Sequence, residues 1–63
     1  MIVEVNDIVE VKLLGGRLVD TGKVVEIYKF NGQKEFMMLS HEVSPGQVVS
    51  FGERHVSRII SKG

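Results

Sequence analysis

Apolar and polar residues alternate along much of this chain, and valine and isoleucine fill most of the apolar positions. Segment 7–13, DIVEVKL, shows the alternation most clearly, with Val9, Val11 and Leu13 on one side of an extended chain. Side chains of a strand point alternately to its two faces, and β-branched residues favour strands over helices. The pattern predicts a half-buried strand over this segment.

A glycine-rich stretch separates this strand from a second one. We expect a long loop here, with Gly15 and Gly16 in it and a turn at residues 20–22, DTG. Segment 23–30, KVVEIYKF, is predicted to be a long, bent strand. No single alternation accommodates all of its apolar residues, so we expect a bulge near Val24-Val25.

Two dipeptides mark the turns of the second half. Asn31-Gly32 accepts the positive φ angles of a tight hairpin, so segment 34–40, KEFMMLS, is expected to pair back on the second strand. In this segment one of the two adjacent methionines should enter the core and the other should point outward. Pro45-Gly46 is expected to turn the chain into a fourth strand, segment 47–51, QVVSF.

The last residues complete an all-β fold. Segment 52–55, GERH, suits a single 3-10 turn, and segment 56–60, VSRII, is predicted to be a short fifth strand. The 63 residues have room for one domain, 1–63, in which five strands form a small closed barrel that the last strand seals. The residues expected in its core are Val9, Val11, Val25, Ile27, Phe36, Val48 and Val56.

Composition narrows the chemistry. The chain has no cysteine, and its two histidines, His41 and His55, cannot complete a four-ligand zinc shell, so we expect no disulfide, metal or cofactor. Eight basic residues balance eight acidic ones, which argues against a strong grip on nucleic acid. The apolar N-terminus is interrupted by Glu4, Asp7 and Glu10, so we expect no signal peptide or membrane contact, and a cytoplasmic location.

Five segments between residues 6 and 60 resemble, in their spacing, an SH3-like barrel of the KOW and Tudor kind. They are NDIVEVK, DTGKVVEI, FMMLS, QVVSF and ERHVSRI. The resemblance implies a five-stranded SH3-like barrel with a 3-10 turn before the last strand. It also implies a binding face bordered by the glycine loop and the hairpin at Asn31.

Segment 45–59, PGQVVSFGERHVSRI, is similar to a stretch of the plasmid-borne type II dihydrofolate reductases. In that family four copies surround one pore, which a Val-Gln-Ile-Tyr segment of each copy lines. This chain has Val48, Val49, Ser50 and Phe51 there, so the glutamine amide and the tyrosine hydroxyl that orient the substrates are absent. The similarity therefore implies a shared scaffold and self-association rather than the reductase activity.

Three classes of function follow. We favour a small non-enzymatic module that binds protein, or nucleic acid weakly, over an oligomeric reductase and over a phage or mobile-element accessory protein that acts by association. The binding residues proposed are Arg17, Tyr28, Phe30, Asn31, Val49, Phe51, Arg54 and His55. No residue is assigned a catalytic role, since segment 40–46, SHEVSPG, is typical of a polar loop.

Self-association is expected through residues 47–51. If Val48 points into the barrel, alternation turns Val49 and Phe51 outward, beside an outward Met37 or Leu39. A contiguous apolar patch on a chain with a tiny core usually marks an interface. The sequence therefore predicts a homo-oligomer.

Overall fold

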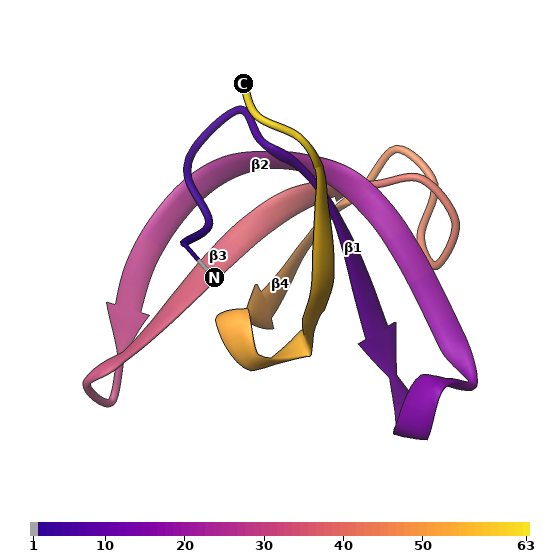
Figure 1. Ribbon diagram of the computed structural model, residues 1–63, viewed down its shortest axis with the longest axis horizontal. Helices are drawn as coiled ribbons and strands as arrows, with labels where there is room; N and C mark the ends of the chain where they lie inside the picture. The colour runs from indigo at the N-terminus through magenta and orange to yellow at the C-terminus, as the bar shows by residue number, and fades with distance from the viewer. Residues whose placement is uncertain (1) are drawn as a thin grey trace.

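The computed structural model describes residues 2–63 and contains one sheet of five antiparallel strands (Figure 1). In chain order the strands are β1 (Ile8–Leu13), β2 (Leu18–Phe30), β3 (Gln33–Ser40), β4 (Val48–Gly52) and β5 (Val56–Ser61). Two 3-10 turns, η1 (Leu14–Gly16) and η2 (Glu53–His55), lie before β2 and β5. The all-β class and the 3-10 turn before the last strand are thus confirmed. The described residues contain no helix that could cross a membrane.

The hairpin between β2 and β3 forms as predicted. Asn31 and Gly32 alone connect the two strands, and both have positive φ angles, 53° and 76°. Asparagine and glycine tolerate this left-handed backbone better than other residues. The predicted bulge is also present, because the register of β2 against β3 shifts between Val24 and Glu26. There β2 bends and arches over the molecule, with β3 beside it (Figure 1).

The predicted long loop before β2 is wrong. β2 begins at Leu18, so Asp20, Thr21 and Gly22 lie inside a 13-residue strand rather than in a turn. Gly22 has a different reason to be glycine, because a Cβ atom there would collide with the backbone carbonyl of Leu39 on β3. Only the η1 turn and Arg17 connect β1 to β2.

The sheet is not closed, which corrects the predicted barrel. Its strand order is β4-β3-β2-β1-β5, so β4 and β5 are two open edges. The turn η2 takes the chain from the β3 side of the sheet to the β1 side, where β5 pairs with β1 alone. The last strand therefore does not seal the fold, and both edges keep unpaired backbone groups.

The core lies under the arch of β2. Its fully buried apolar side chains are Val3, Val9, Val11, Val24, Phe36 and Met38. Ile27, Val49, Phe51, Val56 and Ile59 are partly buried against them. The predicted burial of Val9, Val11 and Phe36 is confirmed, and Ile27 and Val56 are at the margin of this core.

Two predicted core residues are exposed instead. Val25 is 44% exposed, because the bulge gives its neighbour Val24 the inward position. Val48 is 56% exposed, because β4 pairs with β3 in the opposite parity to the one predicted.

The cross-strand partners show which face of β4 is inward. Val49 lies opposite Met38, and Phe51 lies opposite Phe36, whose ring centroid is 6.5 Å away. Residues directly opposite in an antiparallel pair share a face of the sheet. Val49 and Phe51 therefore face the core, and the prediction that they form an outward patch is wrong.

Candidate binding surface

Apolar side chains gather on the solvent-facing side of β2, β3 and β4. Leu39 on β3 lies directly opposite the outward Val48 on β4, and the next outward residue of β3 is Met37. Phe30 lies apart from them at the end of β2, opposite Gln33, and the β2 residues opposite Met37 and Leu39 are the exposed Glu26 and Lys23. We call Tyr28, Phe30, Met37, Leu39 and Val48 the outer surface. Phe30 is 61% exposed and Val48 56%, so this surface presents apolar area to water.

Tyr28 is fixed within the outer surface. Its hydroxyl hydrogen-bonds the hydroxyl of Ser50, which lies on β4, two strands away from β2. The tyrosine side chain therefore crosses β3 between Glu35 and Met37, its two outward neighbours there. Ser50 also donates to the carbonyl of Phe36 at 3.4 Å. An aromatic ring already held in place loses little conformational entropy when a partner covers it.

A charged group borders this surface at the hairpin end. The guanidinium of Arg54 lies 3.2 Å from the carboxylate of Glu35 and 3.2 Å from the side-chain oxygen of Gln33. Arg54 folds over Gly52, where any Cβ atom would collide with the guanidinium. Glycine at the end of β4 thus lets a charged pair lie flat against the sheet. Such a polar border around an apolar centre is typical of protein interfaces.

The structure brings together only half of the predicted binding residues. Tyr28, Phe30, Asn31 and Arg54 lie around the β2–β3 hairpin. Arg17 is exposed at the other end of β2, beside η1, a full strand length away from the hairpin (Figure 1).

The other three predicted residues face the core side. Val49 and Phe51 pack against buried residues, as described above. His55 is half-buried, and its ring meets the ring of Phe51 edge-on, with centroids 6.1 Å apart. Its Nδ1 atom is buried without a hydrogen-bond partner in the described part of the chain. His55 thus acts here as an aromatic neighbour of the core.

Two buried carboxylates were missed by the sequence analysis, and Asp20 is one of them. Its oxygens accept hydrogen bonds from the Ser40 hydroxyl at 2.6 Å and from the backbone amides of Thr21, His41 and Glu42 at 2.8, 3.2 and 2.9 Å. Burial opposes ionisation, but these donors outweigh it and hold the pKa of Asp20 below its ordinary value. Asp20 therefore anchors the loop of residues 41–47, which leads into β4.

The polar loop has no catalytic arrangement of its serine and histidine. The Ser40 hydroxyl is directed to Asp20, whereas the His41 ring is exposed and hydrogen-bonds the Thr21 hydroxyl at 3.0 Å. The two side chains thus have separate partners. The loop is held to the sheet through Asp20 and Ser40, which accept hydrogen bonds from the amides of Glu42 and Ser44.

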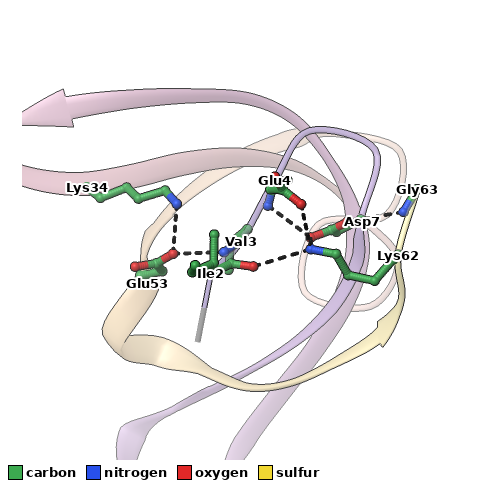
Figure 2. Close-up of polar contacts among 8 residues, drawn as sticks. All are labelled: Ile2, Val3, Glu4, Asp7, Lys34, Glu53, Lys62 and Gly63. Atoms are coloured by element: carbon green, nitrogen blue, oxygen red, sulfur yellow. Dashed lines mark hydrogen bonds and ion pairs between the residues drawn. The ribbon is translucent and has the colours of Figure 1, made fainter.

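Asp7 is the second buried carboxylate, and it joins the two ends of the chain (Figure 2). Lys62 lies 2.8 Å from it, and the backbone amides of Glu4 and Gly63 donate to it at 2.9 and 3.1 Å. Lys62 is the main cause of the lowered pKa of Asp7, and the same contact raises the pKa of Lys62.

A second contact holds the N-terminal segment over the core. The carboxylate of Glu53 accepts a hydrogen bond from the amide of Val3 at 2.9 Å and pairs with Lys34 at 3.0 Å (Figure 2). The amide bond is the main cause of the lowered pKa of Glu53. The segment is thereby fixed with Val3 fully buried, although the sequence analysis had not placed Val3 in the core.

No family model, curated protein or solved structure matches this chain significantly. Residues 2–63 contain no group of three or more histidine, aspartate or glutamate side chains placed to bind a metal ion. The case for a function therefore depends on the surface and the edges of the sheet.

Proposed function

We propose that this protein is a small, non-enzymatic, cytoplasmic binding module that contacts a protein partner through its outer surface. The observation that carries the proposal is the outer surface itself, five apolar side chains on the exposed face of three adjacent strands. Leu39 and Val48 lie directly opposite each other in it, and charged and polar residues of β2 and β3 surround the rest. Exposed apolar side chains gathered on one face of a small chain are a candidate interaction site.

Two further observations support this proposal. The ring of Tyr28 is already oriented by Ser50, and Arg54 with Glu35 supplies a polar border. Tyrosine and arginine, with tryptophan, are enriched among the residues that dominate binding energy. The strand order, with η2 before β5, is compatible with the SH3-like plan that the sequence resembles.

Charge favours a protein partner over nucleic acid. Several basic side chains of the described residues lie in ion pairs with carboxylates: Lys34, Arg54, Arg58 and Lys62. A paired lysine or arginine must give up its carboxylate before it can neutralise a phosphate. The balanced charge of the whole chain acts in the same direction.

The test is a quantitative capture experiment with three baits. The first is the parent chain, and the second is Phe30→Ser/Leu39→Ser, which removes two outer-surface side chains. The matched control is Leu14→Ser/Ile60→Ser, because Leu14 and Ile60 are also exposed but lie on η1 and β5. Lysate of the source organism, with and without nuclease treatment, is passed over each bait, and bound proteins are quantified by mass spectrometry.

We expect a partner that the parent and the control retain equally and that the outer-surface variant loses at least tenfold, which is about 1.4 kcal/mol. Equal recovery by all three baits would refute the outer surface as the binding site. Recovery that nuclease abolishes would favour a nucleic-acid partner. Turnover of dihydrofolate with NADPH by the parent would favour the reductase alternative instead.

A further inference from the structure

The two open edges of the sheet differ in how they are protected. β5 carries Arg58, and its pairing with β1 has two register shifts, between Ile8 and Val9 and between Glu10 and Val11. Charged side chains and bulges are the usual devices that stop an edge strand from pairing with another chain. β4, by contrast, has the sequence VVSFG, and its register with β3 is regular. Only one of the two edges thus carries these devices.

The hydrogen-bond pattern shows which groups of β4 are free. The Ser40 amide donates to the carbonyl of Gln47 at 2.9 Å, so these two residues form a hydrogen-bonded pair through this one bond, while the Ser40 carbonyl accepts from the neighbouring amide of Gly46 at 3.0 Å. Such pairs alternate along an antiparallel ladder, so Val49 and Phe51 are bonded to β3. The N–H and C=O groups of Val48, Ser50 and Gly52 therefore point away from β3. Those of Val48 and Ser50 are at the exposed edge, whereas Gly52 is buried beneath the Arg54 side chain.

We propose that β4 pairs antiparallel with β4 of a second copy of this chain, about a two-fold axis at Ser50. In that arrangement Ser50 of each copy donates to the carbonyl of Ser50 in the other. Val48 pairs in the same way with Gly52 of the other copy once the exposed Arg54 side chain, which covers Gly52, moves aside. Every outward backbone group of β4 then finds a partner, and the two sheets become continuous. This proposal does not depend on the proposed protein partner.

The side chains of β4 fit this pairing. Val49 of one copy would lie opposite Phe51 of the other on the core side, where both are only partly buried in the single chain. Opposite residues without mutual backbone bonds approach most closely, which favours contact between these two side chains. The strand has no charge, so no like charges meet at the axis.

A second copy presenting β5 is a poorer occupant of the same edge. The pairing of β4 with β5 would be heterologous, so it would leave a free β4 and a free β5 at the ends and grow without closing. The bulges and Arg58 on β5 oppose it. A two-fold pair of β4 strands closes at two copies, and the arginine-bearing edges remain outside.

The first test measures mass by light scattering from about 1 μM to about 1 mM protein, the range in which weak specific complexes form. We expect the parent to approach twice 7.0 kDa as concentration rises. Ser50→Lys and Ser50→Glu should each remain at 7.0 kDa, since like charges then face each other across the axis. An equimolar mixture of the two should recover the dimer.

The same two substitutions at Ser61 on β5 are the matched control, and these variants should dimerise like the parent. Far-UV circular dichroism establishes that each variant is folded. Val49→Lys is not a suitable variant for this test. Val49 packs against the core, so a lysine there would destabilise the single chain as well as any dimer. A parent that stays at 7.0 kDa up to about 1 mM overturns the proposal, and so does a charge mixture that stays monomeric.

A second test removes only the backbone donor. A synthetic chain with an N-methyl group at Ser50 lacks the outward N–H but keeps the side chain and the ladder to β3. We expect this chain to stay folded, as far-UV circular dichroism measures, and to stay monomeric. A folded N-methyl-Ser50 chain that still dimerises would rule out pairing through β4. Because these changes leave Phe30 and Leu39 intact, failure here is distinct from failure of the outer surface.

Discussion

Asp7 and Asp20 are both buried carboxylates, yet they are stabilised in different ways. Asp7 is 1% exposed and has a cationic partner, Lys62, whose side chain is 54% exposed. Asp20 is fully buried and has none among its hydrogen-bond partners, which are a hydroxyl and three backbone amides. One carboxylate thus depends on a flexible charged side chain, and the other on donors fixed by the fold.

The difference shows which parts of the molecule each carboxylate controls. Asp7 joins the segment before β1 to the last two residues, far along the chain from β4. Asp20 orders the loop of residues 41–47, whose last residue bonds to β3 and leads directly into β4. Asp20 should therefore influence the outer surface and the β4 edge, whereas Asp7 should influence only stability.

The largest expected effect comes from Asp20→Ala. This change leaves the amides of Thr21 and Glu42 and the Ser40 hydroxyl without their acceptor, whereas the His41 amide keeps the Thr21 carbonyl at 3.0 Å. We expect it to lower the free energy of unfolding by about 2–4 kcal/mol. Urea unfolding followed by circular dichroism measures it. Asp20→Asn is the control, because an asparagine oxygen can still accept from the amides. Dimerisation should weaken in Asp20→Ala even at temperatures where the chain remains folded.

Asp7→Ala provides the contrast. We expect it to lower the melting temperature by less than half as much as Asp20→Ala, since Lys62 can turn to Glu4, 2.9 Å away, or to solvent. The concentration dependence of the mass should not change. If Asp7→Ala instead weakened dimerisation as much as Asp20→Ala, the two carboxylates would not control separate regions.

The Asp20 site illustrates why part of this structure escaped sequence analysis. Asp20-Thr21-Gly22 has the composition of a turn, and only the tertiary fold shows that Asp20 accepts bonds from residues 20 positions away. Gly22 is required by the approach of the Leu39 carbonyl, which no local pattern reveals. By contrast, the Asn31-Gly32 turn and the bulge at Val25 follow from backbone preference and alternation within one segment, and both were predicted.

The candidate site shows the same division. Tyr28, Phe30 and Asn31 could be grouped in advance because a hairpin fixes its own neighbours, whereas Arg54 reaches the hairpin from η2 only through the tertiary fold. Which face of β4 points into the core could not be predicted, because Val48 and Val49 are identical residues and alternation allows either one to be inward. The pairing of Val49 with Met38 and of Phe51 with Phe36 decides between the two orientations of β4. The expected outward patch of Val49 and Phe51 is therefore absent, and the open edge of β4 is the candidate for self-association.

A smaller effect is expected from salt. The contact between Asp7 and Lys62 is screened because the lysine is half exposed, and the screening length falls from about 30 Å at 10 mM salt to about 3 Å at 1 M. The stability lost in Lys62→Met should therefore shrink at high salt. The loss in Asp20→Ala should stay the same, because neutral donors surround that carboxylate. Equal shrinkage in both variants would contradict the distinction.

The smallest effect is the dependence of stability on pH. The pKa values of Asp7 and Asp20 are both below the ordinary 3.8 in the folded chain, chiefly because of Lys62 at Asp7 and, at Asp20, because its donors outweigh burial. An unfolded carboxylate takes up its proton first as pH falls, so both groups stabilise the fold fully above about pH 5 and progressively less below it.

Glu10 and Glu53 act with the same sign, since both also have lowered pKa values, and they contribute in every variant. Unfolding midpoints in urea between about pH 3 and pH 7 should fall with acidification in the parent. The fall should be shallower in Lys62→Met, because the main cause of the low pKa of Asp7 is then gone. Raising the salt concentration should make the parent resemble Lys62→Met but should not remove the share of Asp20. If the unfolding midpoint of Lys62→Met fell with acidification as steeply as that of the parent, the backbone donors rather than the lysine would stabilise the charge of Asp7. Asp7 and Asp20 would then be stabilised in the same way.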